Sequence, residues 1–418
     1  MSTSFASAYQ IFEQDAASLG TYHAGSAASA NSAATEWYNP AGMVELKQQE
    51  LSIGGELVHT NIIYNGTQTN NSNIIATTTE SAHINGGGWT PVPNIHYVLP
   101  FDKWAFGIGV VAPFGAETDY GDSTALRYSG TKTQLQTVDL TPAIAFKVNK
   151  FLSVGIGADI VYATGEFDNV FLYYDDLDFN TGDYSVTNKG DGFNYGYHAG
   201  ILFKLNENNH FGITYHSQIN VNLKGTTTVG GNTSFLQKYF PNVQDGDNFS
   251  TKMILPAWWD LSYYSQITEN FAVMASAIYT EWDSVSSTEL KNVADPVSGG
   301  YGDITIEQHF KNSWNFALGA TYDVTPKWQL KAGVGYDQTP TVDEYRNIYI
   351  PDQDRYIVAT GVAYKIMPLM TLSLNYAHFF VRNASINVTQ PMFVTEQTTN
   401  GNVNSDADLI GLQMDWKF

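Results

Sequence analysis

The sequence predicts an all-β membrane protein, an antiparallel transmembrane β-barrel of about 14 strands with an N-terminal hatch, or plug, in its lumen. Three observations predict this fold. Apolar and polar residues alternate along most of the chain, the connections between the alternating segments are by turns short and long, and residues 1–46 lack the alternation. A membrane barrel needs such segments because its outer face meets lipid and its inner face does not.

Composition supports this fold class and excludes others. The 418 residues include 14% aromatic and only 15% charged side chains, against about 25% charged in soluble domains. No run of about 20 apolar residues occurs, which excludes a membrane-spanning helix. The formal net charge of −21 argues against a nucleic-acid partner. Cysteine is absent, which fits an oxidising compartment.

Residues 1–46 are the predicted hatch. From Ala16 to Thr35 they are rich in Ala, Ser and Gly, which favours short helices and tight turns in close packing. We expect them to fold back into a barrel formed by residues 47–418; the alternative is a disordered tail. Met1 is not followed by a basic stretch and an apolar one, so we expect a secretory signal to be absent from this sequence or already removed. The apolar anchors of the hatch would be Tyr9, Ile11, Phe12, Trp37 and Tyr38.

From Leu51 to the end, period-two alternation predicts strands with two different faces. A soluble sandwich also alternates, so this pattern alone leaves both folds open. Four segments show it best. Their predicted outer faces are Trp104, Phe106, Ile108, Val110, Ala112 and Phe114; Leu152, Val154, Ile156, Ala158, Ile160 and Tyr162; Trp328, Leu330, Ala332, Val334 and Tyr336; and Ile410, Leu412, Met414, Trp416 and Phe418.

Connection lengths favour the barrel. Short turns such as Pro100 to Lys103 alternate with long polar stretches, as the two ends of an outer-membrane barrel require. Aromatic residues at the ends of the outer faces predict the two interfacial girdles. We interpret the long stretches as external loops: 64–86, 115–134, 168–192, 225–251, 284–310, 338–355 and 382–406.

Several motifs resemble one known family. The segment Asn39-Pro40-Ala41-Gly42-Met43 resembles the hatch motif of the FadL family of outer-membrane long-chain fatty acid transporters. The resemblance extends over both ends and most of the strands, and it is weaker in the long loops. Further motifs that carry it are Leu255-Pro256 with Trp259, Phe310-Lys311-Asn312, Gly335-Tyr336-Asp337, Ile350-Pro351-Asp352-Gln353-Asp354-Arg355 and the terminal Phe418.

This resemblance implies a barrel of fourteen strands with a hatch, a hydrophobic landing site among the external loops, and an interior ligand pocket. It also implies a kinked third strand through which the ligand leaves sideways into the bilayer. Burial of an apolar ligand is favourable by about 0.8 kcal/mol per methylene, so a route that stays in hydrocarbon avoids a costly release into water. Asn39, Pro40, Ala41 and Gly42 are then expected to serve the hatch.

Two groups of residues match the implied route. Pro113, Gly115 and Gly121 lie where the third strand is expected to bend, although ordinary strand termination explains them too. Apolar clusters in two predicted loops are candidates for the landing site; packing of the loops on each other is the alternative. The clusters are Val170, Phe171, Leu172, Tyr173 and Tyr174, and Phe235, Leu236, Tyr239 and Phe240.

A fatty acid carboxylate needs a cation when it is buried. Lys311 matches a position that the family uses for this role, and Arg355 is a second candidate unless it pairs with Asp352 or Asp354. The sequence departs from the family pattern at the fifth strand, because Lys and Arg are absent between Phe151 and Asn188. Relatives that carry neutral aromatic hydrocarbons would not need that second cation, so this ligand class stays open.

Other chemistry is not indicated. Asp175, Asp176 and Asp178, and Asp245 with Asp247, lack the spacing of a calcium loop and are expected to be solvated. His59, His198 and His216 show no zinc pattern. We therefore predict no metal, no cofactor and no catalytic residue.

The functional hypothesis is a monomeric, passive channel of the bacterial outer membrane, in contact with membrane lipid and lipopolysaccharide, that takes up fatty acids or other hydrophobic compounds. A general porin for hydrophilic solutes and an outer-membrane lipid hydrolase are the alternatives.

Overall fold

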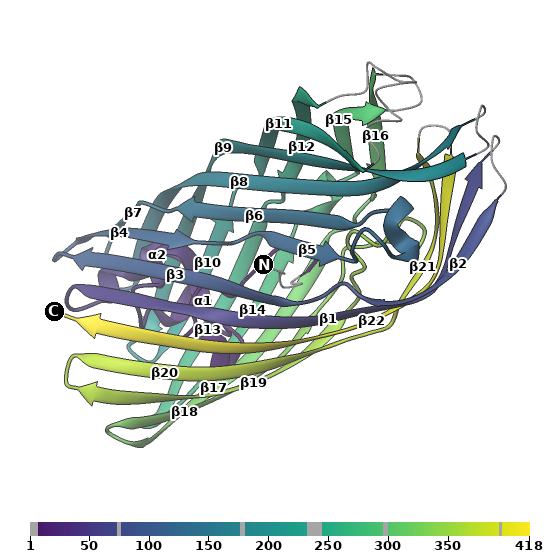
Figure 1. The fold of residues 1–418 in the computed structure, drawn as a ribbon. Coiled ribbons are helices and arrows are strands. Elements are labelled where there is room, and N and C mark those ends of the chain that lie inside the picture. Colours follow the sequence, from purple (N-terminus) through teal and green to yellow (C-terminus); the bar gives the residue numbers. More distant parts are fainter. Residues whose placement is uncertain (1–6, 73–76, 176–179, 232–244, 296–299, 393–394) are drawn as a thin grey trace.

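The computed structural model describes residues 7–72, 77–175, 180–231, 245–295, 300–392 and 395–418. Its strands form one closed antiparallel barrel of 14 spans (Figure 1). The first strand, β1 (Glu50–Ser72), pairs along its whole length with the last, β22 (Thr395–Lys417). This pairing closes the sheet, so the predicted fold class is confirmed.

Most spans consist of two consecutive strand segments, and the others of one. In chain order after β1 they are β2 (Thr78–Asn85) with β3 (Trp89–Pro100), β4 (Trp104–Val111) with β5 (Gly115–Asp119), β6 (Lys132–Leu140) with β7 (Ala143–Lys147), β8 (Leu152–Asp175), β9 (Asn180–Asn206), β10 (Asn209–His216) with β11 (Ile219–Gly231), β12 (Gly246–Leu255) with β13 (Trp258–Thr268), β14 (Phe271–Thr280) with β15 (Ser287–Asp295), β16 (Gly300–Glu307) with β17 (Ser313–Thr325), β18 (Trp328–Asp337), β19 (Arg355–Met367), β20 (Met370–Val381) with β21 (Ala384–Met392), and β22.

Short helices complete the fold. Four precede the barrel, and they are η1 (Leu19–Thr21), α1 (Ser26–Ser29), α2 (Thr35–Tyr38) and η2 (Pro40–Glu45); two more, η3 (Ala125–Tyr128) and η4 (Trp282–Ser284), lie between strands. Across the part of the chain that the structure describes, none of the helices is both long and apolar enough to cross a membrane.

The strands alternate as expected where they face lipid. Trp104, Phe106, Ile108 and Val110 of β4 are exposed, whereas Ala105 between them is fully buried. The predicted outer faces of β8 and β18 follow the same rule. The two-residue repeat of a strand therefore places the apolar residues on the lipid side.

The long polar stretches differ from the prediction, because most of them are strands rather than loops. Residues 168–192, for example, lie largely in β8 and β9, whose ladder continues to the pair Asp175 and Asn180. The pairs β1–β2, β11–β12, β15–β16 and β21–β22 likewise form hairpins at the same end of the barrel. Beyond the membrane a strand has no lipid face, so it carries no apolar alternation that sequence could detect.

The described part of the N-terminal segment lies inside the barrel (Figure 1). All five predicted anchors, from Tyr9 to Tyr38, are at most 5% exposed. The alternative of a disordered tail is therefore wrong for residues 7–46. That this segment is a separate domain ending at residue 46 stays a prediction.

Glycines of the barrel wall admit the hatch backbone. A Cβ at Gly212 of β10 would lie 1.8 Å from the carbonyl oxygen of Ala27, and one at Gly200 of β9 would lie 2.0 Å from Oδ1 of Asn39. Real Cβ atoms do not approach backbone so closely, so the wall must lack a side chain at Gly212. The sequence has a glycine at this position, where α1 crosses β10.

Gly212→Val tests the fit of the hatch. We expect the barrel to close but the hatch to be displaced, because overpacking of this kind costs about 1–3 kcal/mol or more. Limited proteolysis should then cut the hatch, and ion conductance in planar bilayers should rise. Gly300→Val is the matched control, since nothing lies within 4 Å of a Cβ at Gly300. A hatch in the Gly212 variant that resists protease as the unaltered protein does would contradict the packing argument.

Candidate functional site

The interior between the hatch and the long hairpins is apolar. The largest cluster of buried hydrophobic residues lies there and includes Tyr9, Phe114, Trp282 and Phe310. Tyr9 meets Trp282 edge-on, with 4.7 Å between the ring centroids, and its hydroxyl donates to the carbonyl oxygen of Ile254 at 2.6 Å. Apolar side chains of this kind form the sites that bind hydrophobic small molecules.

The hatch motif is fixed by the side chain of Asn39. Its Oδ1 accepts from the backbone N of Ala41 at 3.1 Å, and its Nδ2 donates to the carbonyl oxygens of Ala27 at 2.6 Å and Ile201 at 3.0 Å. Pro40 begins η2, where a missing N–H costs nothing. A Cβ at Gly42 would meet Oγ1 of Thr35 at 2.2 Å. Asn39 thus joins two parts of the hatch to β9.

The third span leaves the barrel wall between β4 and β5. Residues 113–118 are all buried, so the alternation ends after Val111. Phe114 forms a lone bridge with Gln10 of the hatch; the N of Ile11 donates to Pro113 O, and the N of Gly115 donates to Tyr9 O, both at 2.8 Å. The sequence had placed Phe114 on the outer face; it is 5% exposed because the strand bends inward at Pro113.

This bend interrupts the hydrogen-bond ladder of the wall, and we call the unpaired stretch between the second and third spans the slot. Among the described residues, β5 pairs only with β6, and Trp89–Asn94 of β3 pair only with β1. Hydrogen bonding between the second and third spans resumes at Ile95 with Val110 on one side of the slot and at Gly86 with Asp119 on the other. Pro113 and Gly115 therefore border the slot.

The edge of the slot that β3 forms was not among the predicted residues. Pro91 and Pro93 lie in the stretch of β3 that has no partner toward β5, and proline suits a free strand edge because it has no N–H to leave unpaired. Two prolines inside an alternating strand were the available signal. Gly121 lies beyond β5 in a turn with φ of 77° and not at the bend.

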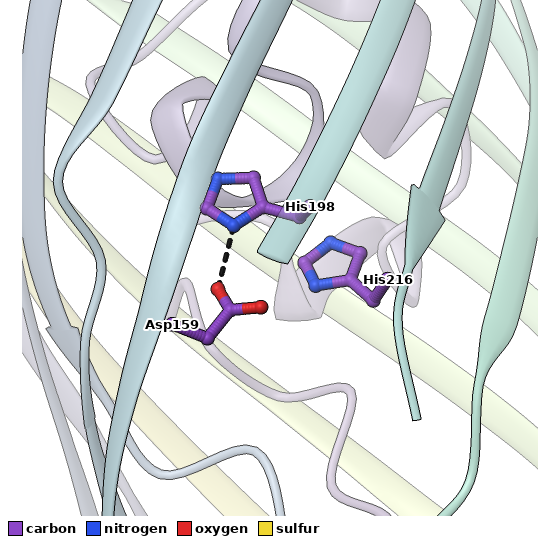
Figure 2. Close-up of side chains that lie close together, drawn as sticks. All are labelled: Asp159, His198 and His216. Atoms are coloured by element: carbon purple, nitrogen blue, oxygen red, sulfur yellow. Dashed lines mark hydrogen bonds and ion pairs between the residues drawn. The ribbon is translucent and has the colours of Figure 1, made fainter. Parts of the chain in front are cut away.

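The histidines fall into two settings. His59 stacks on Trp89, with 4.4 Å between the ring centroids. His198 and His216, by contrast, lie in the lumen and meet Asp159 (Figure 2). This grouping joins three spans, and no spacing in the sequence indicated it. Of the acidic residues considered for calcium, Asp245 accepts from the backbone N of Val229 at 2.9 Å, Asp247 is exposed, and the side chains of Asp175, Asp176 and Asp178 lie outside the described residues.

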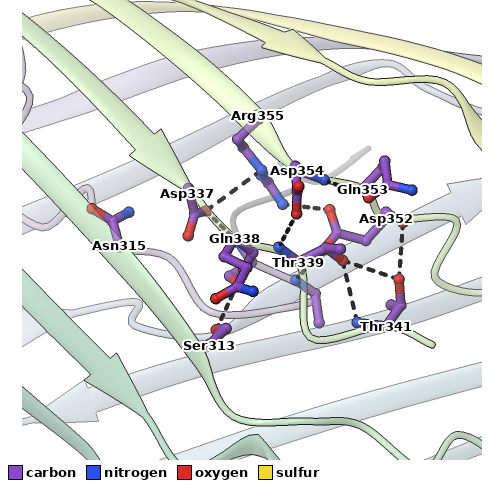
Figure 3. Close-up of polar contacts among 12 residues, drawn as sticks. Ser313, Asn315, Asp337, Gln338, Thr339, Thr341, Asp352, Gln353, Asp354 and Arg355 are labelled. Atoms are coloured by element: carbon purple, nitrogen blue, oxygen red, sulfur yellow. Dashed lines mark hydrogen bonds and ion pairs between the residues drawn. The ribbon is translucent and has the colours of Figure 1, made fainter.

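Arg355 is buried and already paired (Figure 3). Its Nη2 lies 2.5 Å from Oδ1 of Asp352, and its Nε lies 3.5 Å from Oδ2 of Asp337. Backbone N atoms of the hatch complete the group, since Ser7 donates to Asp337 at 3.3 Å and Ala8 to Asp352 at 3.1 Å. Of the two expected partners, Asp352 is confirmed, whereas Asp354 pairs with Arg382 instead.

Lys311 has a different environment. It lies between β16 and β17 and is exposed, and its backbone N donates to Pro340 O at 3.0 Å. Within the described residues its side chain has no ion pair, whereas Arg355 is buried between two carboxylates. Near the fifth span, Lys132 of β6 and Lys189 of β9 both contact Glu166 at 3.2 Å. The neighbouring spans thus supply the cations that the fifth lacks, and a carboxylate already engages them.

The landing-site residues are only partly described. Phe171 is 7% exposed and stacks on Tyr184, with 5.5 Å between the centroids, so it packs inward and is not a surface residue. Tyr184 belongs to the same predicted loop, so the packing of the two loops on each other stays a prediction. The side chain of Leu172 and the residues Phe235, Leu236, Tyr239 and Phe240 lie outside the described residues.

Fold and interior together define an outer-membrane barrel channel for hydrophobic compounds. The family model described as outer membrane protein transport protein (OMPP1/FadL/TodX) matches residues 1–418, and the chain belongs to this family. The resemblance drawn from the motifs is thereby confirmed.

Individual relatives agree with this membership. The chain is 28% identical to outer membrane protein P1 of Haemophilus influenzae, over 99% of this chain and 95% of that protein. It is 27% identical to a long-chain fatty acid transport protein of Escherichia coli O6:H1, over 85% and 83% of the two chains. A Pseudomonas aeruginosa FadL homologue of known structure has a TM-score of 0.87 at 24% identity, with 98% and 99% of the chains covered.

Arg355→Met tests the buried ion pairs. Asp337 and Asp352 would lose their cation, and removal of one partner from a buried pair costs about 3–5 kcal/mol. We expect a correspondingly lower free energy of unfolding in urea with lipid vesicles. Arg382→Met is the control, because its side chain is 63% exposed and its pair with Asp354 spans 3.6 Å; exposed pairs contribute about 0–1 kcal/mol. Equal losses in the two variants would refute a special role for burial.

Proposed function

We propose that this protein takes up long-chain fatty acids and delivers them sideways into the outer leaflet of the outer membrane. The slot beside β5 is the observation that carries the proposal. It separates Trp89–Asn94 of β3 from the bent third span, and the apolar cluster around Phe114 lies directly behind it. A hydrophobic ligand can pass from that interior to lipid without crossing water.

The physics of burial favours this route. Transfer of each methylene from hydrocarbon to water costs about 0.8 kcal/mol, so a long acyl chain strongly prefers an exit into the bilayer. The hatch blocks the direct path to the periplasm, which disfavours a general porin. The proposed mechanism needs no catalytic residue, and each monomer contains its own interior, hatch and slot.

Relatives named as long-chain fatty acid transport proteins support the fatty acid. In the proposed sequence, exposed Lys311 attracts the carboxylate at the entrance, and the apolar cluster accepts the chain. A neutral aromatic hydrocarbon is the second candidate, and one observation favours it. Arg355, Lys132 and Lys189 already face carboxylates, so an anionic ligand must compete for them.

Co-purifying ligands distinguish the two candidates. We expect mass spectrometry of the purified protein to detect long-chain fatty acid, and Lys311→Ala to reduce its occupancy, because this variant removes an exposed cation that has no ion pair among the described residues. Lys327→Ala is the control, since Lys327 is also exposed but lies in a short turn at the other end of the barrel. A neutral hydrocarbon that persists in both variants would replace the fatty acid as the substrate.

Photo-crosslinking tests the exit. A long-chain fatty acid with a diazirine near its methyl end, added to outer membranes that contain the protein, should label peptides with residues 89–94 and 113–119. These two stretches border the slot. Labelling confined to the hatch surface at the end with short turns, around α2, would instead show passage through the lumen.

A further inference from the structure

Three buried side chains from neighbouring spans lie close together, next to the hatch (Figure 2). Asp159 of β8, His198 of β9 and His216 of β10 are 2%, 0% and 5% exposed. The register of β8, β9 and β10 brings these residues together. His216 lies directly opposite His198, and His198 lies opposite Gly157, two residues before Asp159. One potential ligand atom from each residue lies within 4.8 Å of the other two.

The Nε2 atom of each imidazole forms a hydrogen bond with the hatch. Nε2 of His198 lies 3.2 Å from the carbonyl oxygen of Glu36, and Nε2 of His216 lies 3.2 Å from that of Trp37. A carbonyl oxygen only accepts, so both Nε2 atoms carry protons, and in a neutral ring Nδ1 presents a lone pair. Histidines that bind metals are held in this way, with the second nitrogen donating to a backbone carbonyl.

Both Nδ1 atoms are directed at the cluster. That of His198 lies 2.6 Å from Oδ1 of Asp159. That of His216 makes no hydrogen bond to any part of the chain that the structure describes. Gly157 leaves room for the arrangement, because a Cβ there would lie 2.2 Å from the His198 ring. The three residues therefore offer two imidazole nitrogens and a carboxylate to one small space, and an ion would replace the proton that His198 and Asp159 share.

The surroundings carry excess negative charge. Asp139 of β6 is 2% exposed, its Oδ1 has no hydrogen-bond partner among the described residues, and Asp159 and Glu36 repel its charge. Asp139 pairs in register with Val161, which places it beside Asp159 on the lumenal face. A buried carboxylate with one unpaired oxygen is costly, and a nearby divalent cation would remove much of that cost.

We propose that Asp159, His198 and His216 bind a divalent transition-metal ion with the ligand preference of Zn²⁺. Two imidazoles and one carboxylate match Zn²⁺, whereas Ca²⁺ and Mg²⁺ prefer sets of oxygen ligands. Tetrahedral bonds of about 2.1 Å would separate the ligand atoms by about 3.3 Å. The His198 and His216 rings are stacked with 4.9 Å between their centroids, so ion binding must turn one ring out of this stack. The ion would connect three spans of the wall and stiffen the two rings that hold the carbonyls of α2.

Zinc binding to the full, untagged chain in detergent tests this site. After treatment with a chelator, calorimetric titration with Zn²⁺ in excess Ca²⁺ should show one saturable site per barrel; the Ca²⁺ occupies any weak site on the acidic hairpins. His216→Phe should abolish this binding while retaining the ring stack on Trp258, whose centroid lies 4.0 Å away. His210→Phe should bind as the unaltered protein does, because His210 lies on the same strand outside the cluster.

A second variant and a second signal guard against a folding defect. Asp159→Asn changes one ligand without loss of volume, and the heat-dependent gel shift of folded barrels verifies that each variant is folded. Co²⁺ should give visible d–d absorption in the unaltered protein and in His210→Phe only. Absence of saturable Zn²⁺ binding in the unaltered protein, or undiminished binding in folded His216→Phe and Asp159→Asn, would overturn the proposal and leave a hydrogen-bonded pair.

Discussion

Lipid offers no hydrogen-bond partner to the peptide backbone, and the rest of this structure depends on that constraint. The barrel satisfies it by joining β1 to β22, which leaves no free edge around most of the wall. The bend of the third span breaks the ladder at one place. There the hatch supplies substitutes, since the backbone of Tyr9 and Ile11 bonds Gly115 and Pro113, and the prolines of β3 remove donors from the opposite edge. The gap in the ladder thus persists with few unsatisfied groups.

The same constraint explains why polar groups inside the barrel occur in sets. Arg355 has carboxylates on two sides, and Glu36 accepts from His96 at 2.8 Å and from Thr141. Buried charges of this kind are tolerated only when they are paired. Each set also includes a residue or backbone group of the hatch. The polar interior therefore fixes the hatch in position, and the apolar cluster lies beyond it.

Much of the fold could be predicted from the sequence, because alternation is a local property. The outer faces of β8 and β18 follow from a two-residue repeat, and the small residues from Ala16 to Thr35 indicated close packing in the lumen. The long hairpins escaped detection since strands in water need no apolar face. Phe114 was misplaced because the repeat continues through the bend that Pro113 introduces. The register between strands determines which residues lie opposite each other, and it cannot be read from one strand alone. The contacts of Arg355 with Asp337 and of Asp159 with both histidines depend on it.

The hatch and the slot form one mechanical unit. The hatch is attached near Arg355 through Ser7 and Ala8, and it is attached to the wall through the carbonyls of α2. The backbone from Tyr9 to Ile11 lies between these attachments and bonds the bent third span. Displacement of the hatch would leave Pro113 O and Gly115 N without partners next to lipid, at a cost of about 1–3 kcal/mol for each. Displacement of the hatch therefore favours a matching shift of the third span, because that shift keeps these two hydrogen bonds.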